Sequence, residues 1–381
     1  MDEAIRVNKE PERPERGPID LPFLCLVLML TAIGLIMLFS ASFVFAQRPQ
    51  FGSPTYFLVR QGVMAIAGVV IMIIISFMDY QYFRMLALPV MIVALIFLIL
   101  VPFIGVDHNT DAKRWINLGL FSFQPSEIAK LGVIMTFSAM ISVYREKMKI
   151  FKYGILPFVL ILAMIAGLLY LQPHFSGTIL ILGVGAVLMF AGGAHWGWFA
   201  GALGAGGAGL FYIITQTEYA ARRIEIWLDP FTDPQVGGYQ AIQSLYALGS
   251  GGLFGVGLGR SRQKYAYLPE RHNDFIFAVI GEELGYVGAC LMIFLFMMLI
   301  LRGYWIAMRA RDRFGSLLVT GVITLLALQV FFNIGVVSTL LPTTGISLPF
   351  FSWGGTSLII QLAQMGIVLA VSRRIPAPKS G

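Results

Sequence analysis

Charged residues are scarce in this chain of 381 residues. Asp, Glu, Lys and Arg together make up 12% of the sequence, whereas hydrophobic residues make up 57% and the mean hydropathy is +0.79. A soluble domain carries about 25% charged residues, so the composition excludes an ordinary soluble fold. The apolar residues fall in long runs rather than at amphipathic spacing, which predicts an all-α polytopic membrane protein.

Cysteine and histidine are also few, and their placement excludes several kinds of site. Cys25 and Cys290 both lie in apolar runs, so neither a disulfide framework nor a thiolate metal site is expected. The histidines lie far apart and show no ligand spacing such as HxxxH. The first apolar run is too long for the core of a signal peptide and no clean cleavage motif follows it, so we expect it to remain as a helix.

Long apolar runs of about 20 residues predict ten transmembrane helices. Their expected bounds are 20–46, 57–78, 83–104, 125–144, 154–172, 176–193, 195–215, 274–301, 315–340 and 354–372. Only the turn GGAHWG separates the sixth run from the seventh, so counts of nine or eleven also fit the sequence. We expect one membrane domain over 19–373, a disordered cytoplasmic tail at 1–18 and a short cytoplasmic tail at 374–381.

The distribution of Lys and Arg predicts the orientation. Basic clusters at 144–152, 302–313 and 372–379 fall on the same side as the amino-terminal tail if there are ten spans. The positive-inside rule makes that side cytoplasmic. Both termini are therefore expected in the cytoplasm.

The connection 216–273, between spans seven and eight, is expected on the extracytoplasmic side. It is far longer than an ordinary loop and carries several cations, among them Arg222, Arg260 and Lys264. A loop of this length crosses regardless of its charge. Its length and charge indicate a functional segment rather than a passive connection.

Three outer stretches are candidates for a site, namely 111–130, the long loop, and 341–357. All three mix Gly, Pro, aromatic and polar residues, as irregular backbone lining a cavity does. In the first, Arg114 could bind an anion and Trp115 could stack on a sugar or an apolar chain, although Trp115 taken alone is more typical of an interfacial aromatic. Glu127 and Lys130 stand three apart on one helix face, and either a structural or a functional pair fits that spacing.

The stretch LPERHNDFIFAVIGEELG (268–285) places carboxylates at the start of a membrane helix and within it. Asp274 fits a helix cap, but an acid at a membrane mouth beside a cationic loop is also a functional candidate. In a helix, neither Glu282 nor Glu283 lies at the distance and direction from Asp274 that the paired carboxyls of a hydrolytic glycosidase need. A transferase that uses a diphosphate donor needs only one base and nearby cations.

Long motifs in these same stretches carry a family resemblance. They are KRWINLGLFSFQPSEIAKL, YQAIQSLYALGSGGLFGVGLGRSRQKYAYLPERHNDFIFAVIGEELG and LPTTGISLPFFSWGGTS. The chain resembles the SEDS proteins of bacterial cell-wall synthesis, the FtsW, RodA and SpoVE group, over nearly the whole membrane region, with a slight lean to the FtsW and SpoVE branch. The resemblance implies a peptidoglycan glycosyltransferase that polymerises lipid II, an undecaprenyl-diphosphate disaccharide-peptide. It also implies a class B penicillin-binding protein as partner, together with other division or elongation proteins.

The resemblance also assigns roles by position. The family's essential aspartate falls on Asp274, which would be the catalytic base, and its important tryptophan falls on Trp115. Substrate-binding residues are expected at Arg114, Trp115, Lys130, Arg222, Arg260, Lys264, Ser352, Gly354 and Gly355, with Glu127, Glu282 and Glu283 in support. No certain cofactor is expected; a divalent cation, Mg or Mn, could assist the leaving diphosphate. The family's QPDFGT segment reads QPHFSGT here, with His174 where an acid is expected.

Two other functions fit part of this pattern. A flippase for lipid-linked precursors would use ten spans and membrane-embedded acids, but the charged residues gather at the outer face and not at the midplane. A scaffold without chemistry would have no need of Asp274 beside a cationic loop. No nucleic-acid partner is expected.

Overall fold

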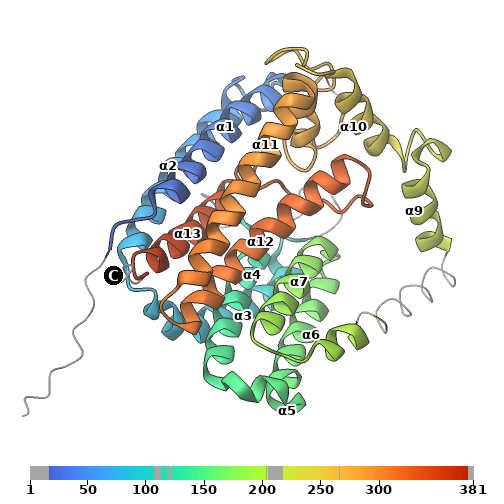
Figure 1. Ribbon diagram of the computed structural model, residues 1–381. Helices are drawn as coiled ribbons and strands as arrows, with labels where there is room; N and C mark the ends of the chain where they lie inside the picture. The colour runs from blue at the N-terminus through green and yellow to red at the C-terminus, as the bar shows by residue number, and fades with distance from the viewer. Residues whose placement is uncertain are drawn as a thin grey trace, which may run out of the picture.

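The computed structural model describes residues 17–106, 113–117, 119, 122–202, 204, 218–265 and 267–375. Within these ranges the chain is almost entirely helical, as the composition predicts (Figure 1). The β-structure there is one short antiparallel hairpin, in which β1 (Ile116–Asn117) pairs with β2 (Ser122–Phe123), and a bridge between Val106 and Trp115. The predicted all-α membrane fold is confirmed.

Most predicted spans correspond to helices within a few residues. Their bounds are α1 (Leu21–Ala46), α2 (Tyr56–Phe77), α3 (Gln81–Ile104), α4 (Pro125–Tyr144), α6 (Leu156–Tyr170), α7 (Phe175–Ala191), α11 (Ile276–Arg309), α12 (Arg313–Val337) and α13 (Gly355–Ser372). A 3-10 turn, η1 (Arg145–Lys149), and the short α5 (Phe151–Gly154) join α4 to α6. Among the described residues, eight helical segments are long and apolar enough to cross a membrane, and α7 is a shorter apolar helix.

The seventh predicted span, 195–215, is described only in part. Residues 196–202 and 204 are helical, whereas 203 and 205–215 lie outside the described residues. Most of the two predicted tails, 1–16 and 376–381, also lies outside them. The count of ten spans therefore stays a prediction.

Both described ends of the chain meet at one end of the helix bundle. The Gly17 N–H donates to the Arg373 carbonyl over 2.9 Å. Asp20 caps α1 and forms a two-pronged ion pair with Arg302, near the end of α11, at 3.0 and 2.8 Å. This terminal end therefore contains the start of α1 and the ends of α11 and α13, and the start of α11 lies at the opposite end.

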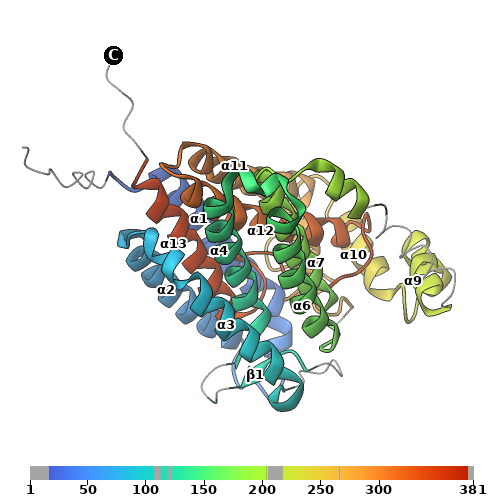
Figure 2. The same ribbon diagram turned by 90° about the horizontal axis from the view of Figure 1, so that it is seen from below.

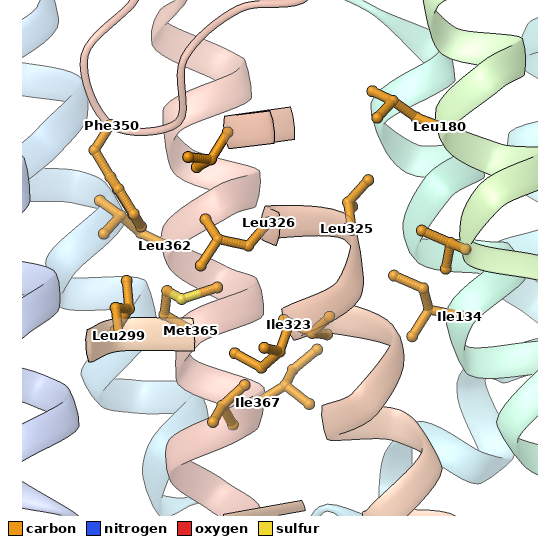
Figure 3. Close-up of a cluster of buried hydrophobic side chains, with 14 of the residues drawn as sticks. Ile134, Leu180, Leu299, Ile323, Leu325, Leu326, Phe350, Leu362, Met365 and Ile367 are labelled. Atoms are coloured by element: carbon orange, nitrogen blue, oxygen red, sulfur yellow. The ribbon is translucent and has the colours of Figure 1, made fainter. Parts of the chain in front are cut away.

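The bundle is built around α12. In the most apolar window of α12, 67% of residues are buried, against 22% in α2, so α12 is central and α2 presents most of its surface outward. Seen from below, α12 lies between α4, α7 and α11 (Figure 2), and it also packs on α13. Figure 3 shows buried apolar side chains of these helices. Because lipid tails are as apolar as these side chains, close van der Waals packing rather than the hydrophobic effect favours contact between the helices.

The long loop is partly helical. It contains α9 (Glu218–Leu228), the 3-10 turn η2 (Pro230–Thr232) and α10 (Tyr239–Ser250), and Figure 1 shows α9 set off from the bundle. The following segment, 251–264, packs against the first part of α11, and α11 is broken there by Gly285 at φ 71°, ψ −171°. A side chain is strained in that conformation, and a Cβ would lie 2.2 Å from the Gly255 nitrogen.

Candidate active site

The end of the bundle opposite the termini brings together three of the predicted outer stretches. Thr356 donates its hydroxyl to the Ser122 carbonyl over 3.0 Å, which joins the last stretch to the first. The Ser352 hydroxyl donates to the Asn273 carbonyl over 2.7 Å, which joins it to the segment before α11. The sequence-based expectation that these stretches form one surface is met for these three segments.

Asp274 lies in this surface, in the turn that precedes α11. The residue is partly exposed, and the backbone beside it is that of Gly345, which is exposed and adopts φ 70°. A Cβ at position 345 would stand 3.3 Å from Asp274 Oδ2, so a side chain at this position would crowd the carboxylate. Asp274 does not cap α11 with its side chain: the cap residue is Phe275, and no side-chain cap bond forms.

The charge environment of Asp274 is mixed. Burial, followed by the Glu270 carboxylate, raises the pKa of the Asp274 carboxyl to about 7, although the Arg114 guanidinium opposes both effects. A carboxyl with this pKa is close to half-ionised at neutral pH, which is the range in which a general base works best. Burial also lowers the pKa of Arg114, and Asp274 opposes that shift.

Arg114 and Lys130 provide the cations of the site. Arg114 donates to the Pro173 carbonyl, and its Nε is buried without a hydrogen-bond partner among the described residues. Lys130, on α4, is 4% exposed and forms an ion pair with Glu127 at 2.6 Å. Glu127 also lines a small cavity of ≈ 20 Å³ next to residues 347–352. The predicted Glu127–Lys130 pair is thus present near the start of α4, with Lys130 buried and Glu127 partly exposed.

His174, where the family pattern has an acid, lies among these groups. Its side chain is nearly buried, and its Nε2 stands 3.3 Å from Gln124 Nε2. Burial, together with the charges of Arg114 and Lys130, lowers the pKa of His174 to about 3. The imidazole is therefore neutral at physiological pH, and this position supplies no negative charge to pair with the two cations.

The remaining predicted residues of the first and last stretches lie near the same surface. Trp115 is partly exposed and follows Arg114, with its carbonyl accepting from the Val106 N–H at 2.8 Å. The Gly354 N–H donates to Gln61 Oε1 over 3.3 Å, and Gly355 packs so closely on Met64 that a Cβ would meet it at 2.7 Å. These two glycines therefore let α13 begin against α2.

Two of the predicted loop cations belong to other groups. Lys264 is 3% exposed and lies 3.5 Å from the buried Glu283 carboxylate. Arg222, on α9, is 70% exposed and forms an ion pair with Asp233 at 3.0 Å. Arg260 is exposed on the segment packed against α11. Direct substrate contact by these three residues stays a prediction.

Glu282 and Glu283 hold the glycine-rich segment in place. Glu282 accepts hydrogen bonds from the Ser261 hydroxyl and from the Arg262 N–H, the latter at 2.8 Å. Glu283 accepts from the Ser40 hydroxyl of α1 at 2.7 Å and from the Ser261 N–H at 3.3 Å. The two acids thus fasten residues 261–264 to α11 and α1, and their supporting role in the site stays a prediction.

The side chains around Asp274 do not form a dedicated metal cage. Across the described part of the chain, no group of three or more His, Cys, Asp or Glu side chains could hold an ion. That a Mg or Mn ion could assist the leaving diphosphate therefore stays a prediction.

Sequence reasoning missed two residues that contact the site's backbone, Gln61 on α2 and Asn333 on α12. Asn333 donates to the Asp274 carbonyl over 2.8 Å, and Gln61 bonds to the backbone on both sides of residue 353. Both are amides within apolar runs, and polar residues inside membrane helices are functional candidates by default. That rule, applied to amides as well as to acids, would have found them.

Comparisons with known proteins agree with this arrangement. Residues 21–375 match the FTSW_RODA_SPOVE family, described as cell cycle protein. A protein of Geobacter metallireducens named "Probable peptidoglycan glycosyltransferase FtsW" is 40% identical, over 93% of this chain and 95% of its own. Stage V sporulation protein E of Bacillus subtilis is 40% identical, over 93% and 97%.

Solved structures give the same result. A chain from work on the coordination of polymerization and crosslinking by a peptidoglycan synthase complex has a TM-score of 0.77 at 31% identity, covering 93% of this chain and 98% of that one. The rod shape determining protein RodA of Thermus thermophilus has a TM-score of 0.67 at 29% identity, covering 94% and 98%. Sequence and fold thus agree over almost the whole length, and the chain belongs to the FtsW, RodA and SpoVE family of cell cycle proteins, the SEDS family.

Proposed function

We propose that this chain is a peptidoglycan glycosyltransferase that polymerises lipid II at the surface around Asp274. Relatives named peptidoglycan glycosyltransferase at about 40% identity support the reaction class. The observation that carries the proposal is the partly exposed Asp274 carboxyl beside Gly345, with a pKa raised to about 7 and Arg114 close enough to oppose that shift.

Asp274 is the general base in the proposed reaction. Its carboxylate takes the proton from the 4-hydroxyl of the acceptor sugar as that oxygen attacks the anomeric carbon of the donor. The donor is the growing strand, still on its lipid diphosphate. The bond from the anomeric carbon to the diphosphate oxygen breaks, the electron pair leaves with the diphosphate, and one displacement inverts the anomeric centre. No second carboxylate is needed, unlike in a glycoside hydrolase.

Cations offset the charge that develops on the leaving diphosphate. Arg114 is suited to this because its planar guanidinium binds phosphate oxygens in pairs, and its Nε has no other partner in the described structure. Lys130 adds positive potential from within α4, although Glu127 neutralises part of it. His174 is neutral and does not reduce this positive potential further, whereas an acid at that position would reduce it.

The proposed sidedness follows from the positive-inside rule. The terminal end of the bundle carries Arg302, Arg309, Arg311 and Arg374, so it faces the cytoplasm with both termini. The site then opens on the extracytoplasmic face, where peptidoglycan is assembled. The partner we propose is a class B penicillin-binding protein that crosslinks the strands, and the similarity to a chain of a peptidoglycan synthase complex supports it.

The direct test of the proposed function is polymerisation by the purified protein in detergent, with lipid II as the substrate. Glycan strands formed without a membrane to cross identify an enzyme, since a flippase has no product under these conditions. The assay is run with and without the transpeptidase partner, and with and without a chelator to test the expected divalent cation. Absence of glycan strands under all of these conditions would refute the proposed polymerase activity.

A further inference from the structure

Three consecutive carbonyl oxygens, those of residues 272, 273 and 274, are each held by a different hydrogen-bond donor. The Trp353 N–H donates to His272 over 2.9 Å. The Ser352 hydroxyl donates to Asn273 over 2.7 Å. The Asn333 amide donates to Asp274 over 2.8 Å. The backbone that leads into Asp274 is thus fixed residue by residue, although it lies in a turn and not in a helix.

The donors are themselves held in place. The Asn333 amide donates a second hydrogen bond to the Ile346 carbonyl over 2.7 Å, so one side chain joins α12 to both segments that meet there. The Ser352 hydroxyl accepts from the Leu348 N–H over 2.8 Å. Each of these two side chains therefore joins the 346–353 segment to the turn that carries Asp274.

Gln61 anchors the same segment to α2. Its Nε2 donates to the Ser352 carbonyl over 3.2 Å, and its Oε1 accepts from the Gly354 N–H over 3.3 Å. Gln61 and Asn333 are each 1% exposed, and a buried amide N–H without an acceptor is costly, which favours the contacts of these donors with the backbone carbonyls. The two amides therefore define where residues 352–354, and through them 272–274, must lie.

Aromatic packing supports the same turn from the side of α1 and α2. The His272 ring stacks on Phe45 with centroids 4.9 Å apart and lies 5.2 Å from Phe57. Phe57 in turn meets Trp353 edge-to-face at 4.8 Å. These contacts limit motion of the two segments as a unit but are not directed at a particular backbone atom. The hydrogen bonds to the three carbonyls, by contrast, fix the position of individual backbone atoms.

We infer that Gln61, Asn333 and Ser352 are positioning residues that set the location of Asp274 relative to Arg114, and that the Ser352 hydroxyl serves this purpose rather than a contact with substrate. This inference rests on the proposed function for its catalytic consequence. A displacement of about 1 Å in a catalytic group lowers the rate about 10²-fold, so loss of one anchor is expected to lower kcat without changing the affinity for lipid II.

The test compares Asn333→Leu and Gln61→Met with Thr324→Val as a matched control. Thr324 lies on α12, is 3% exposed and shares a 2.9 Å hydrogen bond with Tyr304, so its replacement also removes a buried hydrogen bond. Ser352→Ala is a milder third variant, which loses only the hydroxyl. Two readouts are taken from each folded protein: kcat and KM for lipid II polymerisation, and amide hydrogen exchange over residues 270–280.

The expected result is a kcat about 10²-fold lower in Asn333→Leu and Gln61→Met, with KM unchanged and exchange over 270–280 faster than in the wild type. Ser352→Ala shifts both readouts in the same direction, and Thr324→Val shifts neither. Unchanged exchange over 270–280 in all three variants overturns the inference, as does a kcat equal to that of Thr324→Val. An inactive wild type with altered exchange in the variants refutes the proposed function and leaves the positioning of residue 274 established.

Discussion

The properties of Asp274 depend on a balance between neighbouring groups. Burial and the Glu270 carboxylate both favour the protonated carboxyl, whereas Arg114 favours the carboxylate. Glu270 is exposed and accepts a hydrogen bond from the Asn273 side chain at 2.6 Å, so its position is fixed beside the site. With a pKa of about 7, the Asp274 carboxyl is mostly protonated at pH 5 and mostly ionised at pH 8.

The pH dependence of the reaction follows from that balance. Below the pKa of about 7 of Asp274, kcat/KM is expected to fall about tenfold for each pH unit, because only the carboxylate accepts a proton. Glu270→Gln removes the nearby negative charge, retains an acceptor for Asn273, and shifts this limb to lower pH. The measurement is a pH profile of kcat/KM for both proteins.

A limb that moves to higher pH in Glu270→Gln, or does not move, would contradict the assignment of the titrating group.

The Asp274 carboxyl also affects the stability of the protein. Its pKa in the folded protein is raised above the ordinary value, so the folded state holds the proton more tightly and stability falls as pH rises from about 4 to about 7.

The sequence pointed to the charged residues of the candidate site but not to the buried amides that hold its backbone. Asp274, Arg114 and Lys130 were predicted from charge at a membrane mouth and from motifs, and electrostatic contact joins the first two in the structure. Lys264 was grouped with them by proximity in sequence, yet it lies against Glu283. Linear distance along an irregular loop does not define direction in space, so such a residue is not placed by spacing alone.

At the scale of elements, α11 departs most from its predicted bounds. The expected span ended at 301 because charge begins there, but the helix continues to Arg309. Arg302 and Arg309 both lie over the Trp305 ring, at 4.0 and 4.2 Å, so charged side chains beyond the apolar run stabilise further turns instead of ending the helix. Asp312 then caps α12 through the Gly315 N–H.

The break at Gly285 could not be predicted, because glycine is common in membrane helices that remain straight. Here the broken helix leaves the carbonyls of Glu282 and Glu283 free to accept from the N–H groups of Val256 and Gly257, at 3.0 and 3.1 Å. The loop thus replaces bonds that the helix lost.

The buried ion pair between Lys264 and Glu283 is expected to hold this loop on α11. Glu283→Gln leaves Lys264 buried without a counter-charge and is expected to destabilise the protein by about 3–5 kcal/mol, seen as a lower thermal unfolding temperature in detergent. The double variant Lys264→Met with Glu283→Gln recovers part of this loss.

The exposed pair of Arg222 and Asp233 is the matched control for that measurement. Asp233→Asn removes a counter-charge of the same kind from a cation that is 70% exposed, and its expected cost is about 0.2–1 kcal/mol. Equal unfolding temperatures for Glu283→Gln and Asp233→Asn would show that the buried pair does not fasten the loop.

The whole molecule is a multi-pass membrane protein of the SEDS family in which both described chain ends meet at one end of the bundle. Hydropathy predicted most span bounds well because a membrane helix needs a fixed length of apolar sequence. It could not predict the packing order around α12, since every span is apolar and similar in length. The packing order depends on side-chain shape. It brings the start of α11 close to the end of α12 and to the start of α13.

Sidedness is testable by labelling single cysteines. After Cys25 and Cys290 are replaced by Ala, Phe231→Cys in the long loop is expected to react with an impermeant maleimide in intact cells. Arg311→Cys, between α11 and α12, is expected to react only after permeabilisation. Both side chains are exposed in the structure, so access to the reagent depends on the membrane alone. Labelling of Arg311→Cys in intact cells would reverse the proposed orientation.

The central claim is that the Asp274 carboxylate performs the polymerisation chemistry, and the Asp274→Asn protein tests it most directly. The asparagine keeps the shape and removes the base, so the rate of strand formation from lipid II is expected to fall by about 10²–10⁴-fold. The variant should remain folded and should unfold at a higher temperature than the wild type above about pH 7, because a poorly solvated charge is gone. Strand formation by purified, folded Asp274→Asn protein at the wild-type rate would contradict the account.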